Sequence, residues 1–143
     1  MSEVRAEHEL LAARADVWAL LAEPYHLPDW WPAYTGVHPD RRGLAEGARW
    51  TVTRGRTPGF FRRPGGQGTI VIQGVERTLS LGWLDVAQGL AVRIELANAG
   101  PERTRAVVTV EAPWWRLVAE GARGLPREAL SRLHDLCQTA AEL

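Results

Sequence analysis

Apolar and polar residues alternate along much of the chain, and this pattern predicts strands. From Val4 to Leu10 the alternation has a period of two, which is typical of a strand with one buried face. The alternation recurs at 48–53, 79–84, 90–96 and 105–110. Residues 34–38 are a weaker strand candidate, and in 69–75 odd and even positions alike are apolar. Short turn segments lie between several of these stretches, at 42–47, 84–89 and 98–102. Such short connections predict antiparallel strands, because parallel strands need longer crossovers.

Three stretches break this alternation and predict helices or turns. A short amphipathic helix begins near Arg14 and ends at Pro24, which cannot continue a helix. The segment HLPDWWP, residues 26–32, predicts a compact turn or a second short helix. Residues 125–143 carry apolar residues at helical spacing and predict a long C-terminal helix with Pro126 in its first turn and a bend at Gly124 just before it. The same helical spacing continues the apolar face upstream through residues 114–121. This apolar face consists of Trp114, Val118, Gly121, Leu125, Ala129, Leu133, Leu136, Cys137 and Ala140.

The order of these elements predicts an α+β fold in a single domain spanning residues 1–143. We expect one curved antiparallel sheet with a single apolar face, and a long C-terminal helix that covers this face. Two short helices follow the first strand. Where a strongly curved sheet and a straight helix cannot touch, a cavity opens between them.

Composition narrows the class of protein. The 17 basic and 17 acidic residues cancel, so no bulk field attracts nucleic acid or an anionic membrane. Every one of the basic residues is arginine, which we attribute to a GC-rich bacterial genome. The single cysteine, Cys137, excludes an intrachain disulfide and fits a reducing compartment. No secretion signal is evident, and no apolar run approaches the ~18 residues that span a bilayer. We therefore expect a cytoplasmic protein without a membrane span.

Three segments resemble those of a known superfamily. ELLAARADVWALLAEPYHLPDWWP (9–32) has a strand end, a first helix with Val-Trp and a second helix bounded by proline and tryptophan. GLAEGARW (43–50) is similar to a glycine-bearing entry into the third strand, and GPERTRAVVTVE (100–111) to a last strand. The chain thus resembles the START-like (SRPBCC, Bet v 1-like) superfamily with the helix-grip fold. Within it, the polyketide cyclase/dehydratase branch is the most similar.

This resemblance implies a cavity between the concave sheet and the C-terminal helix that takes apolar or aromatic small molecules. The chain's seven tryptophans supply candidate walls. The candidates for lining this cavity lie at inward-facing positions of the strands or on the apolar face of the helix. They are Trp31, Tyr34, Trp50, Trp83, Trp114, Val118, Gly121 and Leu125. Packing in a solid core explains the aromatic members equally well. Gly121 is singled out because a missing side chain leaves volume on the helix face that is turned toward the sheet.

Groups suited to catalysis are few, and the sequence does not identify the catalytic residues. His8, Tyr34 and Arg49 could each polarise a carbonyl, although Arg49 lies on the outward parity. Cys137 lies three residues after His134, but a buried thiol is usually inert. The four histidines and one cysteine show no paired-ligand spacing, so we expect no metal and no cofactor.

Residues 54–68 combine arginine, glycine and proline with Phe60 and Phe61. This segment predicts a hairpin loop whose two phenylalanines form a lid or a subunit contact. An irregular hairpin without a role and a polyanion-binding loop are the alternatives. The function we expect is binding of a small hydrophobic ligand, whether aromatic, lipid or polyketide-like. A cyclase or dehydratase, or an interaction module that uses Phe60 and Phe61, stays open, as does a homodimer.

Overall fold

The computed structural model describes residues 2–55, 66–119 and 122–142. Their strands form one seven-stranded antiparallel sheet in the order β1-β7-β6-β5-β4-β3-β2. The bounds are β1 (Ser2–Leu10), β2 (Tyr34–His38), β3 (Arg49–Arg54), β4 (Gln67–Glu76), β5 (Ser80–Asp85), β6 (Leu90–Gly100) and β7 (Arg103–Ala112). The predicted antiparallel sheet is confirmed, including the weaker strand at residues 34–38.

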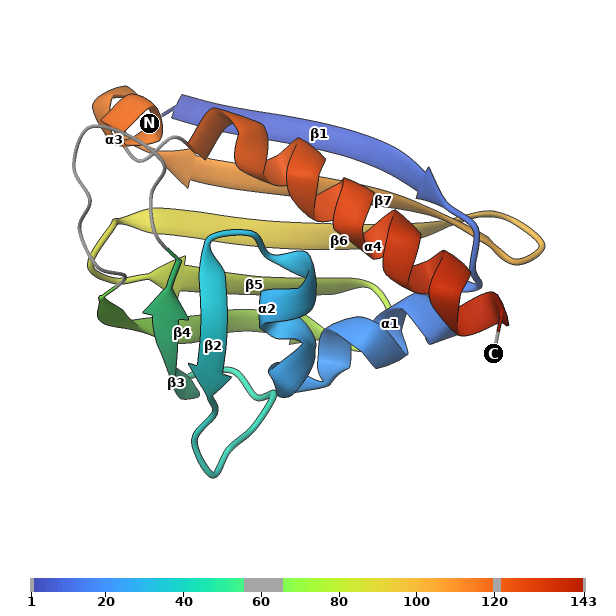
Figure 1. Cartoon of the computed structure of the whole chain (residues 1–143), viewed down its shortest axis with the longest axis horizontal. Coiled ribbons are helices and arrows are strands. Elements are labelled where there is room, and N and C mark those ends of the chain that lie inside the picture. Colours follow the sequence, from blue (N-terminus) through green and yellow to red (C-terminus); the bar gives the residue numbers. More distant parts are fainter. Residues whose placement is uncertain (1, 56–65, 120–121, 143) are drawn as a thin grey trace.

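The bounds of the helices are α1 (Arg14–Ala22), η1 (Pro24–His26), α2 (Leu27–Trp30), α3 (Trp114–Ala119), η2 (Ala122–Gly124) and α4 (Leu125–Glu142). Figure 1 shows that α1, α2 and α4 lie on one face of this sheet, while α3 lies at its end, beside the ends of β1 and β7. The long helix α4 packs on β1 and β7, and α2 packs on β2 and on α4. The predicted α+β arrangement, with two short helices after the first strand and a long C-terminal helix over the sheet, is confirmed.

The core is the layer between the sheet and these helices. In β6 the side chains of Leu90, Val92, Ile94 and Leu96 are buried, as the alternation predicts. Ala129, Leu130, Leu133 and Cys137 of α4 are buried against the sheet. The largest side chains that are fully buried are four tryptophans: Trp30, Trp31, Trp50 and Trp83.

The predicted C-terminal helix with Pro126 in its first turn is confirmed, but the predicted continuation of its apolar face upstream through residues 114–121 is wrong. Helix α3 ends at Ala119, η2 follows, and α4 starts only at Leu125. Pro126 explains the new start, because proline lacks an N–H and its ring would collide with the carbonyl four residues earlier in a continuous helix. Pro126 instead occupies the first turn of α4, where proline is tolerated.

A hydrogen bond from Thr104 links the segment that leads into α1 to the sheet. The side chain of Thr104 is fully buried on β7, and its Oγ1 donates to the Ala12 carbonyl at 2.8 Å. This carbonyl belongs to the segment between β1 and α1, so the contact fixes where the chain leaves the sheet.

Thr104→Val keeps the shape of the side chain and removes this donor, leaving the Ala12 carbonyl without it. We expect the free energy of unfolding to fall by about 1–3 kcal/mol, measured by urea denaturation. Thr51→Val on the exposed face of β3 is the matched control and should stay within about 0.5 kcal/mol of the wild type. Equal losses in the two variants would contradict the assigned role of Thr104.

Candidate functional site

A cluster of polar side chains lies on the buried face of the sheet. The Tyr34 hydroxyl donates to Asp85 Oδ2 at 2.8 Å, and Arg54 Nη2 pairs with Asp85 Oδ1. Asp85 is 1% exposed and Tyr34 2%, so both are withdrawn from water. The Gln88 backbone N–H also donates to Asp85 Oδ1, at 3.4 Å. A buried carboxylate is stable only when it is paired and hydrogen-bonded, and Asp85 meets both conditions.

Strand parity explains why these groups meet. Arg54 continues the inward series Trp50 and Val52 on β3, and Asp85 continues Leu81 and Trp83 on β5. Strand β4 lies between β3 and β5.

Gly68 lets Arg54 cross this middle strand. On β4, Gly68 pairs with Val52 and lies two residues before Ile70, which is opposite Asp85. A Cβ at Gly68 would collide with the Arg54 guanidinium. The missing side chain therefore opens the path along which Arg54 reaches Asp85.

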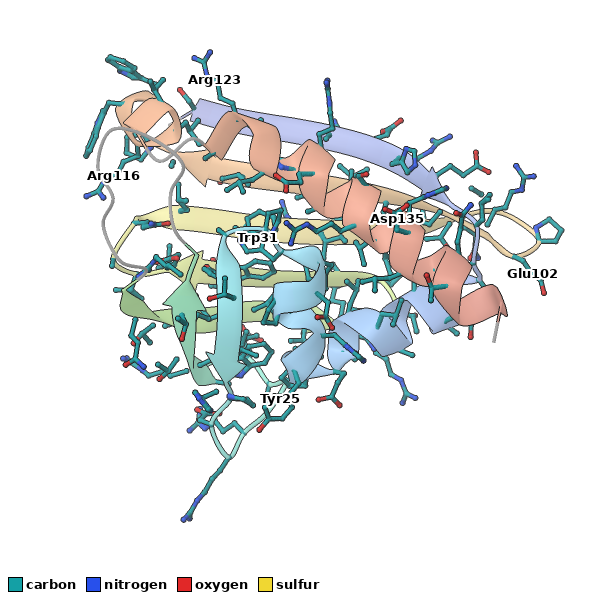
Figure 2. All side chains as sticks on the ribbon, viewed as in Figure 1. Tyr25, Trp31, Glu102, Arg116, Arg123 and Asp135 are labelled. Carbon is teal, nitrogen blue, oxygen red and sulfur yellow. The ribbon has the colours of Figure 1, made fainter. Side chains whose placement is uncertain are left out.

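Three tryptophans form an aromatic cluster that touches the polar cluster through Trp83. The rings of Trp30, Trp31 and Trp83 meet edge to face, with centroids 6.1 Å apart for Trp30 and Trp31, 5.7 Å for Trp30 and Trp83, and 5.3 Å for Trp31 and Trp83. Trp83 Nε1 donates to the Tyr34 hydroxyl oxygen at 3.3 Å, which joins the aromatic cluster to the polar one. Figure 2 shows Trp31 inside the layer between the sheet and the helices.

Two buried N–H donors in this region stand out. Trp30 Nε1 and Arg54 Nε have no hydrogen-bond partner among the described residues. Each such donor costs about 1–3 kcal/mol when it is withdrawn from water. Trp50 differs, because its Nε1 donates to the Gly43 carbonyl at 2.8 Å and so ties β3 to the preceding loop.

The Tyr34 phenol is held in its protonated form. Burial, then the negative charge of Asp85 and the hydrogen bond to it, raise the pKa of Tyr34 well above its ordinary value of 10.0. At neutral pH Tyr34 is thus a hydrogen-bond donor and cannot act as a general base. The single O–H of Tyr34 is already donated to Asp85, so the donor that the cluster can offer to a further oxygen acceptor is Arg54 Nε.

The other catalytic candidates lie away from this cluster. His8 is exposed on β1, where its ring meets that of His134 from α4 with centroids 5.1 Å apart. Arg49 is exposed on the outer face of β3, as its parity predicts. Burial, and then the charge of Asp16, raise the pKa of Cys137, which makes a nucleophilic thiolate unfavourable. Among the described residues, no group of three His, Cys, Asp or Glu side chains could hold a metal ion.

The structure corrects the placement of two lining candidates. Trp114 is 67% exposed and Val118 54% exposed, so neither points into the layer between sheet and helix. Their helix, α3, is separate from α4 and does not share its apolar face. Leu125, at the start of α4, is half-buried against the core. Gly121 and the lid residues Phe60 and Phe61 lie outside the described residues.

Two surface hollows are lined by described residues. One, of about 350 Å³, lies on the outer face of the sheet around Gly74, Gly82 and Arg93. The other, of about 290 Å³, lies where α4 crosses β1 and includes His8 and His134. Neither of them is the predicted cavity, because tryptophan side chains occupy the region between the concave sheet and the helices.

Sequence reasoning missed Arg54 and Asp85 as site residues. In the sequence Arg54 belongs to the arginine-bearing segment 54–68, and Asp85 belongs to the predicted turn at 84–89. The signal that could have identified them is their parity, because each is a charged residue at the end of an inward-facing series. Opposite charges at such positions on nearby strands indicate a buried pair.

Comparison with known proteins gives the fold. No family model and no curated protein match the chain. A START superfamily protein from Mycobacterium smegmatis has a TM-score of 0.71 at 11% identity, covering 96% of this chain and 98% of its own. An AHSA1-like protein from Aeromonas hydrophila has a TM-score of 0.71 at 19% identity, covering 98% and 94%. DynU16, a protein of the dynemicin biosynthetic locus, has a TM-score of 0.70 at 20% identity, covering 98% of this chain and 48% of its own.

The chain has the START-like, helix-grip fold. At these identities the likeness establishes the fold alone, and START-like folds serve many functions.

A double-mutant cycle tests the path of Arg54 across β4. Arg54→Met leaves buried Asp85 without its countercharge and should lower the free energy of unfolding by about 3–5 kcal/mol. Gly68→Ala places a methyl group where the guanidinium lies and should cost about 1–3 kcal/mol. In a protein that already carries Arg54→Met, Gly68→Ala should cost little stability, because the guanidinium with which the new methyl group would collide is absent. Strictly additive losses in chemical denaturation would show that Gly68 has no such role.

The raised pKa of Tyr34 predicts a loss of stability in alkali. The pKa of Tyr34 is higher in the folded than in the unfolded state. The contribution of its phenol to the free energy of unfolding is therefore complete below about pH 10 and is lost as the pH rises through the folded-state pKa. We expect Tyr34→Phe to lose less stability than the wild type between neutral pH and about pH 11. Tyr25→Phe, at an exposed ring, should decline as the wild type does. Parallel curves for the wild type and Tyr34→Phe would contradict this account.

Proposed function

We propose that the protein binds a small apolar molecule between the sheet and its covering helices, and that the Arg54 region holds a polar oxygen of that molecule. The observation that carries this proposal is the pair of buried donors, Trp30 Nε1 and Arg54 Nε, without partners among the described residues. An acceptor oxygen on a bound molecule would satisfy such a donor and recover its desolvation cost.

The surroundings of these donors suit a molecule that is otherwise apolar. Trp30, Trp31 and Trp83 offer ring faces and edges, and Tyr34 and Arg54 lie at one end of this aromatic wall. Trp31, Tyr34, Trp50, Trp83 and Leu125 remain the proposed contacts. Because tryptophan rings occupy the layer, entry of a ligand requires that some of these rings move apart. Direct detection of a bound compound is for this reason the decisive measurement.

A second candidate function is a cyclase or dehydratase of the polyketide type. It is favoured by Arg54 on the concave face, whose buried Nε has no acceptor among the described residues and could polarise a substrate carbonyl. Tyr34, which stays protonated because its pKa is raised, could add a second donor only by turning its O–H away from Asp85. His8 and Arg49 take no part, because both are exposed and lie away from the cluster. One solved structure with this fold, DynU16, comes from the dynemicin biosynthetic locus.

Native mass spectrometry of the freshly purified protein tests the binding proposal. We expect an added mass that disappears on denaturation and belongs to an apolar compound containing a carbonyl, carboxylate or phenolic oxygen. Two probes then test for an oxygen contact: 1-anilinonaphthalene-8-sulfonate, which carries an anionic group, and N-phenyl-1-naphthylamine, which lacks it. The absence of a co-purifying mass, together with no saturable binding of either probe, would refute the proposal.

Arg54→Lys isolates the role of Arg54 in this assay. Lysine keeps the positive charge facing Asp85 but has no N–H equivalent to Nε. We expect binding of the sulfonate probe to weaken by about tenfold, equivalent to ~1.4 kcal/mol, while binding of N-phenyl-1-naphthylamine stays unchanged. Arg49→Lys, on the outer face of the same strand, is the matched control. If both lysine variants bind the sulfonate probe like the wild type, Arg54 does not hold the oxygen.

A further inference from the structure

Helix α3 presents an unusual group of exposed apolar side chains. Trp114 is 67% exposed, Trp115 51% and Val118 54%, all within six residues. Val86, in the turn between β5 and β6, is 53% exposed. We call these four residues, Val86, Trp114, Trp115 and Val118, the α3 patch. Exposed apolar groups gathered in one place commonly mark a surface that contacts a partner or a membrane.

The α3 patch is held in place by the rest of the fold. Leu117 of the same helix is 3% exposed and anchors α3 in the core. Arg116 Nη1 donates to the Ala87 carbonyl at 3.4 Å, which ties α3 to the turn that carries Val86. The exposed tryptophans therefore belong to an ordered helix whose opposite side is already packed.

Positive charge accompanies the patch. The Arg116 guanidinium lies over the Trp115 ring, 4.8 Å from its centroid, and Arg123 is exposed in the adjoining η2. Figure 2 shows Arg116 and Arg123 at the same end of the molecule as α3, whereas Asp135 and Glu102 lie toward the other end. Residues 113–127 contain three arginines and one glutamate, in a chain whose net charge is zero. The patch thus combines apolar rings with a local excess of positive charge.

We propose that the α3 patch docks on an anionic lipid surface, with its tryptophans in the interfacial layer of the bilayer. Tryptophan favours this layer because its ring is apolar and its N–H is polar, and arginine adds attraction to anionic headgroups. This inference goes beyond the proposed function and does not depend on it. Since no helix among the described residues is long and apolar enough to span a membrane, the contact would be peripheral.

The size of the patch argues against a second copy of the chain as the occupant. With ~250 Å² for a whole tryptophan side chain, Trp114 and Trp115 together expose roughly 300 Å². Even with the two valines, the patch falls well short of the ~800 Å² that each partner buries in a stable protein interface. A lipid surface sets no such minimum, because even a small cluster of rings can insert.

Sedimentation with lipid vesicles tests the proposal. We expect the wild-type protein to sediment with vesicles of equal parts phosphatidylcholine and phosphatidylglycerol, and less with phosphatidylcholine alone. The double variant Trp114→Ala/Trp115→Ala should bind the mixed vesicles at least about tenfold more weakly, because it loses the inserted rings. Arg123→Glu should weaken binding to the mixed vesicles and leave binding to phosphatidylcholine unchanged. Since all three side chains are exposed, circular dichroism should confirm that these variants fold.

Two matched controls complete the experiment. Tyr25→Ala removes another exposed ring, 63% exposed and far from α3 in Figure 2, and Arg41→Glu reverses an exposed charge in another loop. Both should bind vesicles like the wild type. Brominated lipids should quench wild-type tryptophan fluorescence more than that of the double variant. Unchanged vesicle binding by the double variant, equal losses in the controls, or a dimer in solution that this variant dissociates would each overturn the proposal.

Discussion

The need to keep one face of a seven-stranded sheet away from water determines the rest of this structure. The strands place apolar side chains on a single face, and α1, α2 and α4 all lie against it. The largest side chains in the layer between them are four fully buried tryptophans. The buried polar cluster is a local exception to this apolar layer. It is tolerated because Arg54, Tyr34 and the Gln88 backbone together satisfy Asp85.

Much of the fold can be read from the sequence because the sheet is amphipathic. The period-two alternation at residues 90–96 corresponds to the buried and exposed sides of β6, and the short turns give an antiparallel order. The apolar residues of 114–118 continue the helical spacing of the C-terminal segment, so this spacing alone does not show that α3 and α4 are separate helices. The single feature that decides it is Pro126, whose ring forces a new helix start.

The candidate site was less accessible to sequence reasoning. Tyr34 was identified as a residue that could direct its hydroxyl inward, but its partner Asp85 lies 51 residues away and Arg54 comes from a third strand. Only the pairing of β3, β4 and β5 brings these groups together. The role of Gly68 depends on the side chain of Arg54, so it cannot be seen from either residue alone. Pairing of distant strands is thus the information that the sequence pattern lacks.

The pairing of the first strand with the last has a consequence for how the chain folds. Ser2 lies opposite Ala112, and Leu10 lies opposite Thr104, so among the described strands β1 pairs only with β7, which is distant from it in the sequence. Contacts so distant in the chain must close a long loop before they contribute stability, and topologies rich in them fold slowly. During synthesis β1 has no partner until β7 has left the ribosome, and α4 can pack on both only after that. Until then β1 is an unpaired strand, the state in which chains of this kind are most prone to associate wrongly.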